Sequence, residues 1–238
     1  MLYIVFAMKG TFLKEARERA GWTQVRLAKR LGVTQAYLSL LETGKRHLPS
    51  HLVRRLARLL DLPATMLPVM ETSASRGRLT NEWFEAQLAR LDYPGFAYRK
   101  RPGTRLHPAE VLLAGLAFED LEPRLVEALP WLVLHYDGLN WEQLVACAKA
   151  RDLQNRLGFV VSLARKVAES KQEFERRRQD LRHLEEGLEP SRLAREETFG
   201  QGHASEGLRT WLRSKQSEAA GHWNLLTDLQ PEHLPYAS

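Results

Sequence analysis

Two short helices separated by a glycine turn are the feature that most limits how this chain folds. They lie within residues 23–49, and Thr23 and Thr34 stand immediately before the two helix-forming runs. At such positions a threonine hydroxyl caps free backbone amides. Gly32 suits the left-handed backbone that ends the first helix. Ala28 is small enough to let a second helix cross the first closely, so the spacing predicts a tight pair of helices.

The second of these helices has different residues on its two faces. Leu38 and Leu41 predict a stripe that faces inward. The start and outer side of the helix are mostly polar, with Thr34, Gln35, Tyr37 and Ser39. These polar side chains are therefore expected to project away from the core.

The segment resembles the Cro/CI repressor family, also called the XRE family. In that family helix 2 begins Thr-Gln, and Glu-x-Gly-x-Arg follows the recognition helix. The match consists of Thr23-Gln24, Glu42, Gly44, Arg46 and Pro49. The resemblance covers about Thr11 to Leu67 and implies a five-helix unit that binds double-stranded DNA through a helix-turn-helix.

The resemblance also implies roles for single residues. Gln35 is the main candidate for base reading, because a glutamine can pair bidentately with adenine. Ala36 and Leu40 stand where family members carry a polar residue, and both can touch thymine methyl groups. The expected base readers are Thr34, Gln35, Ala36, Tyr37 and Ser39, and the expected phosphate ligands are Gln24, Thr43, Lys45 and Arg46.

Glu42 has two possible roles. The family commonly pairs this glutamate with an arginine of helix 1, which is Arg17 here. The alternative is a contact to DNA. We favour the structural pair, and replacing Glu42 should then unfold the domain, because a buried charge left without its partner is strongly destabilising.

Positive charge is concentrated at the N-terminus. Residues 1–70 carry 12 Lys or Arg against 4 Asp or Glu, a net charge of +8, whereas the remainder carries 23 against 25, a net charge of −2. A basic domain is expected of a protein that binds phosphates. Arg54, Arg55 and Arg58 either belong to this surface or form the solvated face of a helix.

Length predicts two domains, since 238 residues exceed one helix-turn-helix unit. We expect a DNA-binding domain at 1–70, including a fifth helix over 63–70, a small polar linker at 71–82, and an all-helical regulatory or dimerisation domain at 83–238. The opening MLYIVFAM is either an edge strand or a translated extension before a true start at Met8, which we favour slightly over Met1. It lacks the length of a membrane helix.

The region after the linker has apolar residues at spacings of three and four, and the fold class predicted for the whole chain is all-α. Helices are expected to begin near Thr80, Pro108, Glu122, Asn140, Asp152, Pro190 and Glu206. A seven-residue repeat of Val160, Val167, Phe174, Leu181 and Leu188 predicts one long helix over 152–188. Two basic segments, residues 93–103 and 176–178, are secondary candidates for nucleic-acid contact. The alternative for 93–103 is a surface loop packed by its own aromatic residues, and the alternative for 176–178 is the solvated face of a helix.

The sequence predicts a sequence-specific transcription regulator. We expect it to act as a dimeric repressor that binds an inverted-repeat operator. The alternative is an autoregulating antitoxin or defence-operon regulator whose second domain binds a co-encoded protein. No phosphate loop, zinc-protease motif or nucleophile elbow is present, so we assign no catalytic residue, cofactor or metal. The single cysteine, Cys147, excludes an intramolecular disulfide and favours the cytoplasm.

Overall fold

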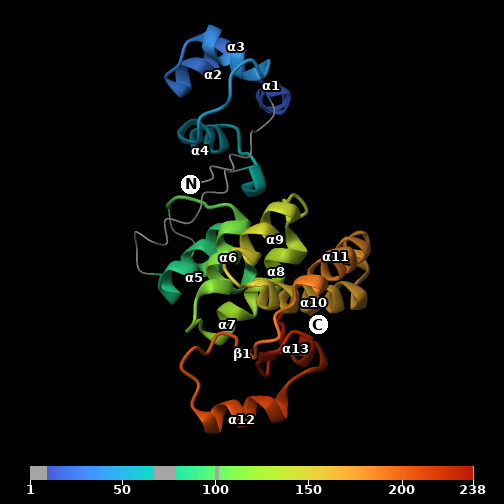
Figure 1. Cartoon of the computed structure of the whole chain (residues 1–238). Helices are drawn as coiled ribbons and strands as arrows, with labels where there is room; N and C mark the ends of the chain where they lie inside the picture. The colour runs from blue at the N-terminus through green and yellow to red at the C-terminus, as the bar shows by residue number, and fades with distance from the viewer. Residues whose placement is uncertain (1–9, 67–78, 100–101, 238) are drawn as a thin grey trace. The chain divides into compact units, whose positions relative to one another are not determined.

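The computed structural model of the chain describes residues 10–66, 79–99 and 102–237. It divides into an N-terminal unit, residues 1–71, and a C-terminal unit, residues 72–238 (Figure 1). Three predicted features lie outside the described residues, namely the opening MLYIVFAM, positions 67–70 of the fifth helix and positions 71–78 of the linker.

The N-terminal unit contains four α-helices within its described residues. They are α1 (Gly10–Arg19), α2 (Gln24–Leu31), α3 (Gln35–Glu42) and α4 (Ser50–Leu59). Where the sequence predicts a fifth helix, Ala64–Met66 form one short 3-10 turn.

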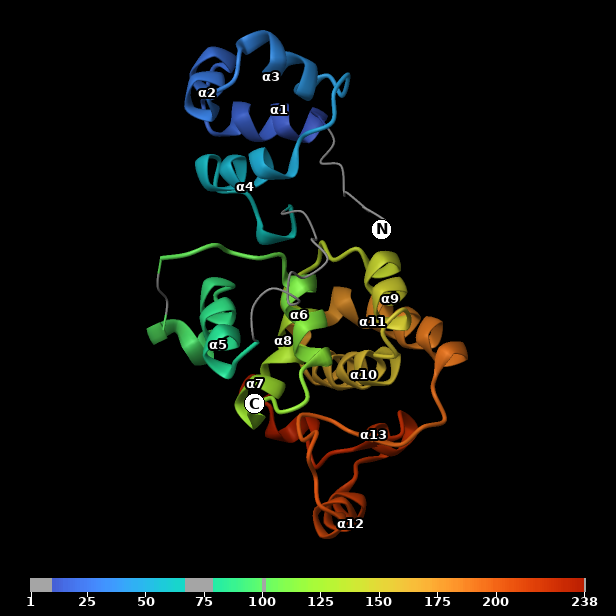
Figure 2. The same cartoon turned by 60° about the vertical axis from the view of Figure 1, so that its left-hand side comes forward.

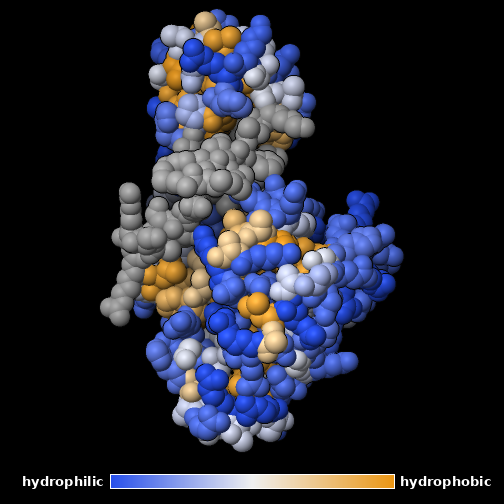
Figure 3. All heavy atoms as spheres, in the orientation of Figure 1, coloured by the Kyte–Doolittle hydropathy of each residue, from blue (hydrophilic) through white to orange (hydrophobic). Residues whose placement is uncertain are grey.

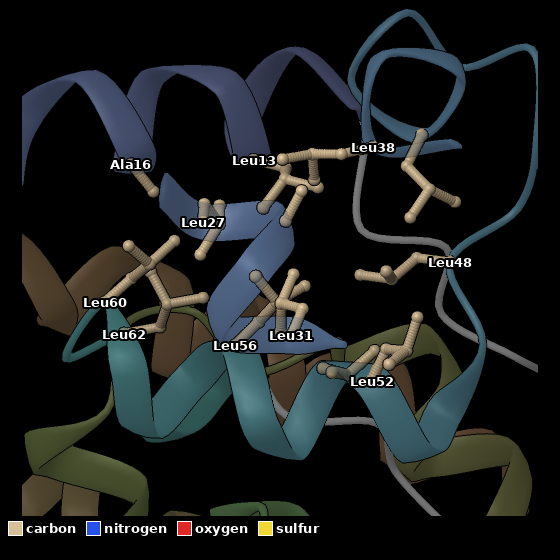
Figure 4. Close-up of a cluster of buried hydrophobic side chains, with 13 residues drawn as sticks. Leu13, Ala16, Leu27, Leu31, Leu38, Leu48, Leu52, Leu56, Leu60 and Leu62 are labelled. Carbon is tan, nitrogen blue, oxygen red and sulfur yellow. The ribbon is translucent and has the colours of Figure 1, made fainter. Parts of the chain in front are cut away.

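One leucine-rich core holds this unit together. Each helix contributes to it: Leu13 from α1, Leu27 from α2, Leu38 from α3 and Leu56 from α4 are all at most 1% exposed. Figure 4 shows these side chains converging between the helices. Burial of leucine side chains is worth about 1.5–3 kcal/mol each, so this core is what fixes the angle between α2 and α3.

The C-terminal unit is also helical, which confirms the all-α fold class. Its larger helices are α5 (Asn81–Arg90), α6 (Pro108–Ala117), α8 (Ala128–His135), α9 (Trp141–Lys149), α10 (Gln154–Ser170), α11 (Glu175–Leu188) and α12 (Glu206–Lys215), and its short ones are α7 (Pro123–Val126) and α13 (Glu218–His222). Short 3-10 turns lie at 94–99, 172–174, 189–191 and 231–233.

Helix α10 is the centre of this unit. Twelve of its 17 residues are buried, and α8, α9 and α11 pack against it. Trp223, which is fully buried, lies with its ring edge against Gly158 of α10, and its Nε1 donates to Ser162 Oγ at 2.8 Å. Trp223 and Trp131 therefore fill the core, whereas Trp211 is 47% exposed.

The prediction of one continuous helix over 152–188 is wrong. The chain leaves the helical conformation at Lys171, where φ is −119° and ψ is 125°, and α11 folds back against α10. The Arg178 guanidinium Nε donates to the carbonyl of Ala168 at 2.7 Å, which caps the end of α10. The heptad residues Val160, Val167, Leu181 and Leu188 are buried, so they serve packing within one chain.

The helix expected to begin near Pro190 is likewise absent, because Glu189–Ser191 form only a 3-10 turn. The buried Asn155 side chain explains this, since its Nδ2 donates to Leu193 O at 2.9 Å and its Oδ1 accepts from Leu193 N at 2.8 Å. These two bonds hold the following segment extended. It leads to β1 (Glu197–Thr198), which pairs in parallel with β2 (Leu225–Leu226). Between the two strands, α12 stands apart from the helices around α10 in Figures 1 and 2.

No helix among the described residues combines the length and the apolar character needed to cross a membrane.

Candidate nucleic-acid interface

Helices α2 and α3 are capped where the sequence indicates. The Thr23 hydroxyl accepts from Arg26 N at 3.2 Å, and the Thr34 hydroxyl accepts from Tyr37 N at 3.1 Å. Gly32 ends α2 with a left-handed φ of 72°, a conformation that a side chain would strain. Only residues 32–34 separate the two helices, so α3 has a fixed direction relative to α2.

The outer side of α3 is accessible to a ligand. Thr34, Gln35 and Ala36 are exposed, and Tyr37 and Ser39 are half-buried. Of the five predicted base readers, Thr34 caps α3, Gln35, Ala36 and Tyr37 form its first turn, and Ser39 follows in the middle of the helix. The first residues of a recognition helix are those that reach base edges in a major groove.

Gln35 does not extend freely from this helix. Its Nε2 donates to Gln24 Oε1 at 2.8 Å, and Gln24 Nε2 in turn donates to Glu42 Oε2 at 2.8 Å. Gln24, expected to bind phosphate, thus joins the start of α2 to both ends of α3. The bond to Gln24 restricts the rotamers of Gln35. Gln35 is thus the outer end of a chain of hydrogen bonds that runs through Gln24 to Glu42, and its amide oxygen is not used in that chain.

The chain of bonds ends in a buried ion pair. Arg17 Nε donates to Glu42 Oε1 at 2.7 Å and Nη2 donates to Oε2 at 3.1 Å, with 7% and 3% of the two residues exposed. Arg17 also donates to Trp22 O at 2.8 Å. The hydrogen bonds to the Glu42 carboxylate raise the pKa of Arg17. Glu42 therefore has a structural role, with its carboxylate facing the interior.

The loop after α3 carries the other predicted phosphate ligands. Thr43, Lys45 and Arg46 are all exposed. Gly44 turns the chain with a φ of 70°, and the Arg46 guanidinium lies 6.0 Å from the centre of the Tyr37 ring. Arg46 thus holds a positive charge near Tyr37 on the outer side of α3, and Lys45 is a second exposed cation in the same loop.

Two neighbouring features were not found by sequence reasoning. Arg26 lies 4.5 Å above the Trp22 ring, a cation–π contact that holds an exposed cation next to α2. Arg55 Nη1 donates to Leu31 O at 3.1 Å and so caps the end of α2. Since this arginine has a structural partner, it serves the fold as well as the basic surface.

Among the secondary candidates in the C-terminal unit, Arg177 and Arg178 have structural roles, whereas Arg176 is exposed. Arg177 is buried and its Nη2 donates to Val133 O at 2.7 Å, and Arg178 caps α10. In the basic loop Tyr93 and Phe96 are buried, which favours packing by its own aromatics, and residues 100–101 are outside the described part of the chain. Nor do the described residues gather three or more His, Cys, Asp or Glu side chains as a metal site would require.

Comparison with known proteins agrees with this geometry at the N-terminus. Residues 10–69 match the family model of a helix-turn-helix domain. Searches of curated proteins and of solved structures gave no match. A helix-turn-helix domain indicates a DNA-binding regulator. The family model and the arrangement of α2 and α3 together identify residues 10–69 of this chain as a helix-turn-helix domain, consistent with the XRE type.

Proposed function

We propose that this chain is a sequence-specific transcription regulator that binds an inverted-repeat operator as a dimer and represses. Residues 1–70 bind DNA, and residues 83–238 form the regulatory or dimerisation domain. The single observation that carries the proposal is the exposed face of α3, where Gln35 is held by Gln24, followed by an exposed loop with the cations Lys45 and Arg46. The match to a helix-turn-helix domain gives no support to the antitoxin alternative.

Base reading in this proposal depends on Gln35. Its amide is oriented by Gln24, which lowers the entropy that the side chain loses when it pairs with a base. A bidentate contact to adenine contributes roughly 1–3 kcal/mol of discrimination. Thr34, Ala36, Tyr37 and Ser39 complete the face that enters the major groove.

Phosphate contacts supply most of the affinity. Thr43, Lys45 and Arg46 follow α3 in one exposed loop, and Gln24 stands at the head of α2. Each charge that neutralises a phosphate releases a counterion, so affinity falls with salt. Two copies related by a two-fold axis would present their α3 helices about 34 Å apart, one turn of DNA.

The test is a selection of bound sequences from a random duplex pool with the full chain and its variants. Gln35→Ala should lose preference at one adenine position per half-site, by roughly 5- to 150-fold. Lys45→Ala should weaken binding to all sequences alike and flatten the slope of log affinity against log salt by about one.

Three results would each contradict one part of the proposal. Identical preferences for the wild type and Gln35→Ala would reject Gln35 as a base reader. A footprint without a palindrome, bound by a monomer in analytical ultracentrifugation, would reject the dimer. Repression itself is measured with a reporter placed behind the selected operator, and activation of that reporter would reject it.

A further inference from the structure

Helix α12 has one side in the core of the C-terminal unit and one side in solvent. Leu212 is fully buried, and the helix packs against β2. The opposite side consists of four exposed residues, Gly207, Thr210, Trp211 and Ser214. Residues three or four apart are neighbours on a helix surface, so these four form one stripe.

The stripe combines a tryptophan with small residues. Trp211 is 47% exposed. The hydroxyls of Thr210 and Ser214 are satisfied within the helix, since they donate to Glu206 O at 3.0 Å and to Trp211 O at 2.6 Å. Glycine weakens a helix, yet a Cβ at Gly207 would meet nothing within 4 Å among the described residues. The stripe therefore offers a large apolar ring and, one turn away, an unfilled place.

We propose that α12 is the surface through which two copies of this chain pair, with their α12 helices antiparallel across a two-fold axis. This inference rests on the proposed dimer and names the surface that forms it. A two-fold axis lets the same patch serve both copies. With the axis at the level of Arg209, Trp211 of each copy lies opposite Gly207 of the other, because both positions are two residues from the axis.

The charges along α12 identify a second copy as the occupant of this face. Glu206 stands in the first turn, and Arg213 and Lys215 stand in the last turn. Residues 206 and 213 are two turns apart and lie on the same side of the helix. In an antiparallel pair each Glu206 therefore comes beside Arg213 of the other copy, twice per dimer, and the helix dipoles are opposed as well. A parallel pair would place like charges together.

Arg213 is available for this contact. Its Nη2 lies 2.7 Å from Glu196 Oε1, which orients the guanidinium, while 48% of the side chain stays exposed. Figure 3 shows mostly hydrophilic and near-neutral residues at the end of the unit where α12 lies. Charge therefore contributes, together with the Trp211 ring, to the choice of partner.

The test is sedimentation velocity of the full chain over a range of concentrations, alone and with the duplex that it selects. One pair of short helices is smaller than a standard interface of about 800 Å² per partner, so the free dimer should dissociate at concentrations on the order of micromolar. Trp211→Ala should weaken dimerisation by about thirtyfold or more, as truncation of a central interface tryptophan commonly does. Tyr98→Ala is the matched control, because Tyr98 is 71% exposed but belongs to the 3-10 turn at 94–99, and it should leave dimerisation unchanged.

A charge exchange tests the antiparallel arrangement. Glu206→Arg alone sets arginines against each other and Arg213→Glu alone sets glutamates against each other, at two places per dimer. Each variant by itself should therefore dimerise about tenfold more weakly. An equal mixture of the two variants regains both attractive pairs and should dimerise nearly as well as the wild type. Mixing would not rescue a change that only unfolded α12, and circular dichroism should give every variant the wild-type helix content.

The outcomes separate this inference from the proposed function. Undiminished dimerisation of Trp211→Ala overturns the pairing through α12 and leaves the proposed dimer in place, formed elsewhere. A mixture that dimerises no better than either charge variant alone also overturns the antiparallel pairing. A wild-type chain that stays monomeric both in solution and on its duplex overturns the proposed dimer as well.

Discussion

The buried ion pair between Arg17 and Glu42 allows a quantitative prediction for Glu42→Gln. This change keeps the shape of the side chain and removes its charge. Arg17 would stay buried without the carboxylate charge, and its acceptors would be the one amide oxygen left at position 42, Trp22 O and the half-exposed Glu18. Breaking a buried pair costs about 3–5 kcal/mol, and these acceptors place the expected cost near the lower value.

That cost is large for the N-terminal unit. A unit of about 60 residues has a stability of about 3–9 kcal/mol, so a cost of about 3 kcal/mol removes at least a third of that stability, and it unfolds the unit completely only at the lowest value of the range. Hydrogen exchange of the full chain, followed by mass spectrometry, measures each unit separately. Amides of α1–α4 should exchange about a hundredfold faster or more, and those of α10 should keep their protection.

Glu18→Gln is the matched control. Glu18 contacts the same arginine at 3.3 Å, but 53% of its side chain is exposed, and exposed ion pairs contribute about 0–1 kcal/mol. A double change, Arg17→Met with Glu42→Leu, should cost much less than the sum of the single changes. If Glu42→Gln exchanges within fivefold of the wild type, the desolvation reasoning fails.

Two further predictions concern the C-terminal unit. Gly158→Ala places a Cβ 2.5 Å from the fixed Trp223 ring and should lower the free energy of unfolding, measured in urea, by about 1–3 kcal/mol. Gly187→Ala in α11 is the control, because its Cβ meets nothing within 4 Å and the change should be neutral or stabilising. Equal effects of the two changes would contradict the packing of Gly158 against Trp223. Burial raises the pKa of Tyr93 to about 12, and an unfolded tyrosine has a pKa near 10, so the folded state holds a proton that the unfolded state releases. The stability that depends on this proton is complete below pH 10 and is lost as the pH rises toward 12, at up to about 1.4 kcal/mol per pH unit. Tyr93→Phe should make the free energy of unfolding fall less steeply with pH in this range. If the dependence on pH is unchanged in Tyr93→Phe, groups other than Tyr93 cause it.

The sequence predicted best those features that depend on local chemistry. Thr23, Thr34 and Asn140 each cap a helix with the side chain, and Pro108 begins α6. Such signals require only the next three or four residues, so they can be read without knowledge of the tertiary fold.

The break at Lys171 could not be predicted in this way. Neither proline nor glycine occurs between Phe159 and Glu186, and the heptad pattern is continuous across the break. The chain turns because α11 buries its apolar side against α10 and Arg178 caps the carbonyl that the turn frees. Both causes are contacts between residues that sequence spacing does not bring together. Helix α8 was not predicted as a separate element, since it is apolar on all sides and carries Pro130 in its first turn.

The position of Gln24 has a consequence for altering the specificity of this protein. Gln24 shares one side-chain amide between Gln35 and Glu42, so a substitution there disturbs the surface and the interior together. Positions 35, 36 and 40 are exposed, and of these only Gln35 is linked to the buried pair, indirectly through Gln24. A library designed to retarget the protein should therefore randomise these three positions and keep position 24 constant, and natural divergence in operator preference is expected to follow the same division.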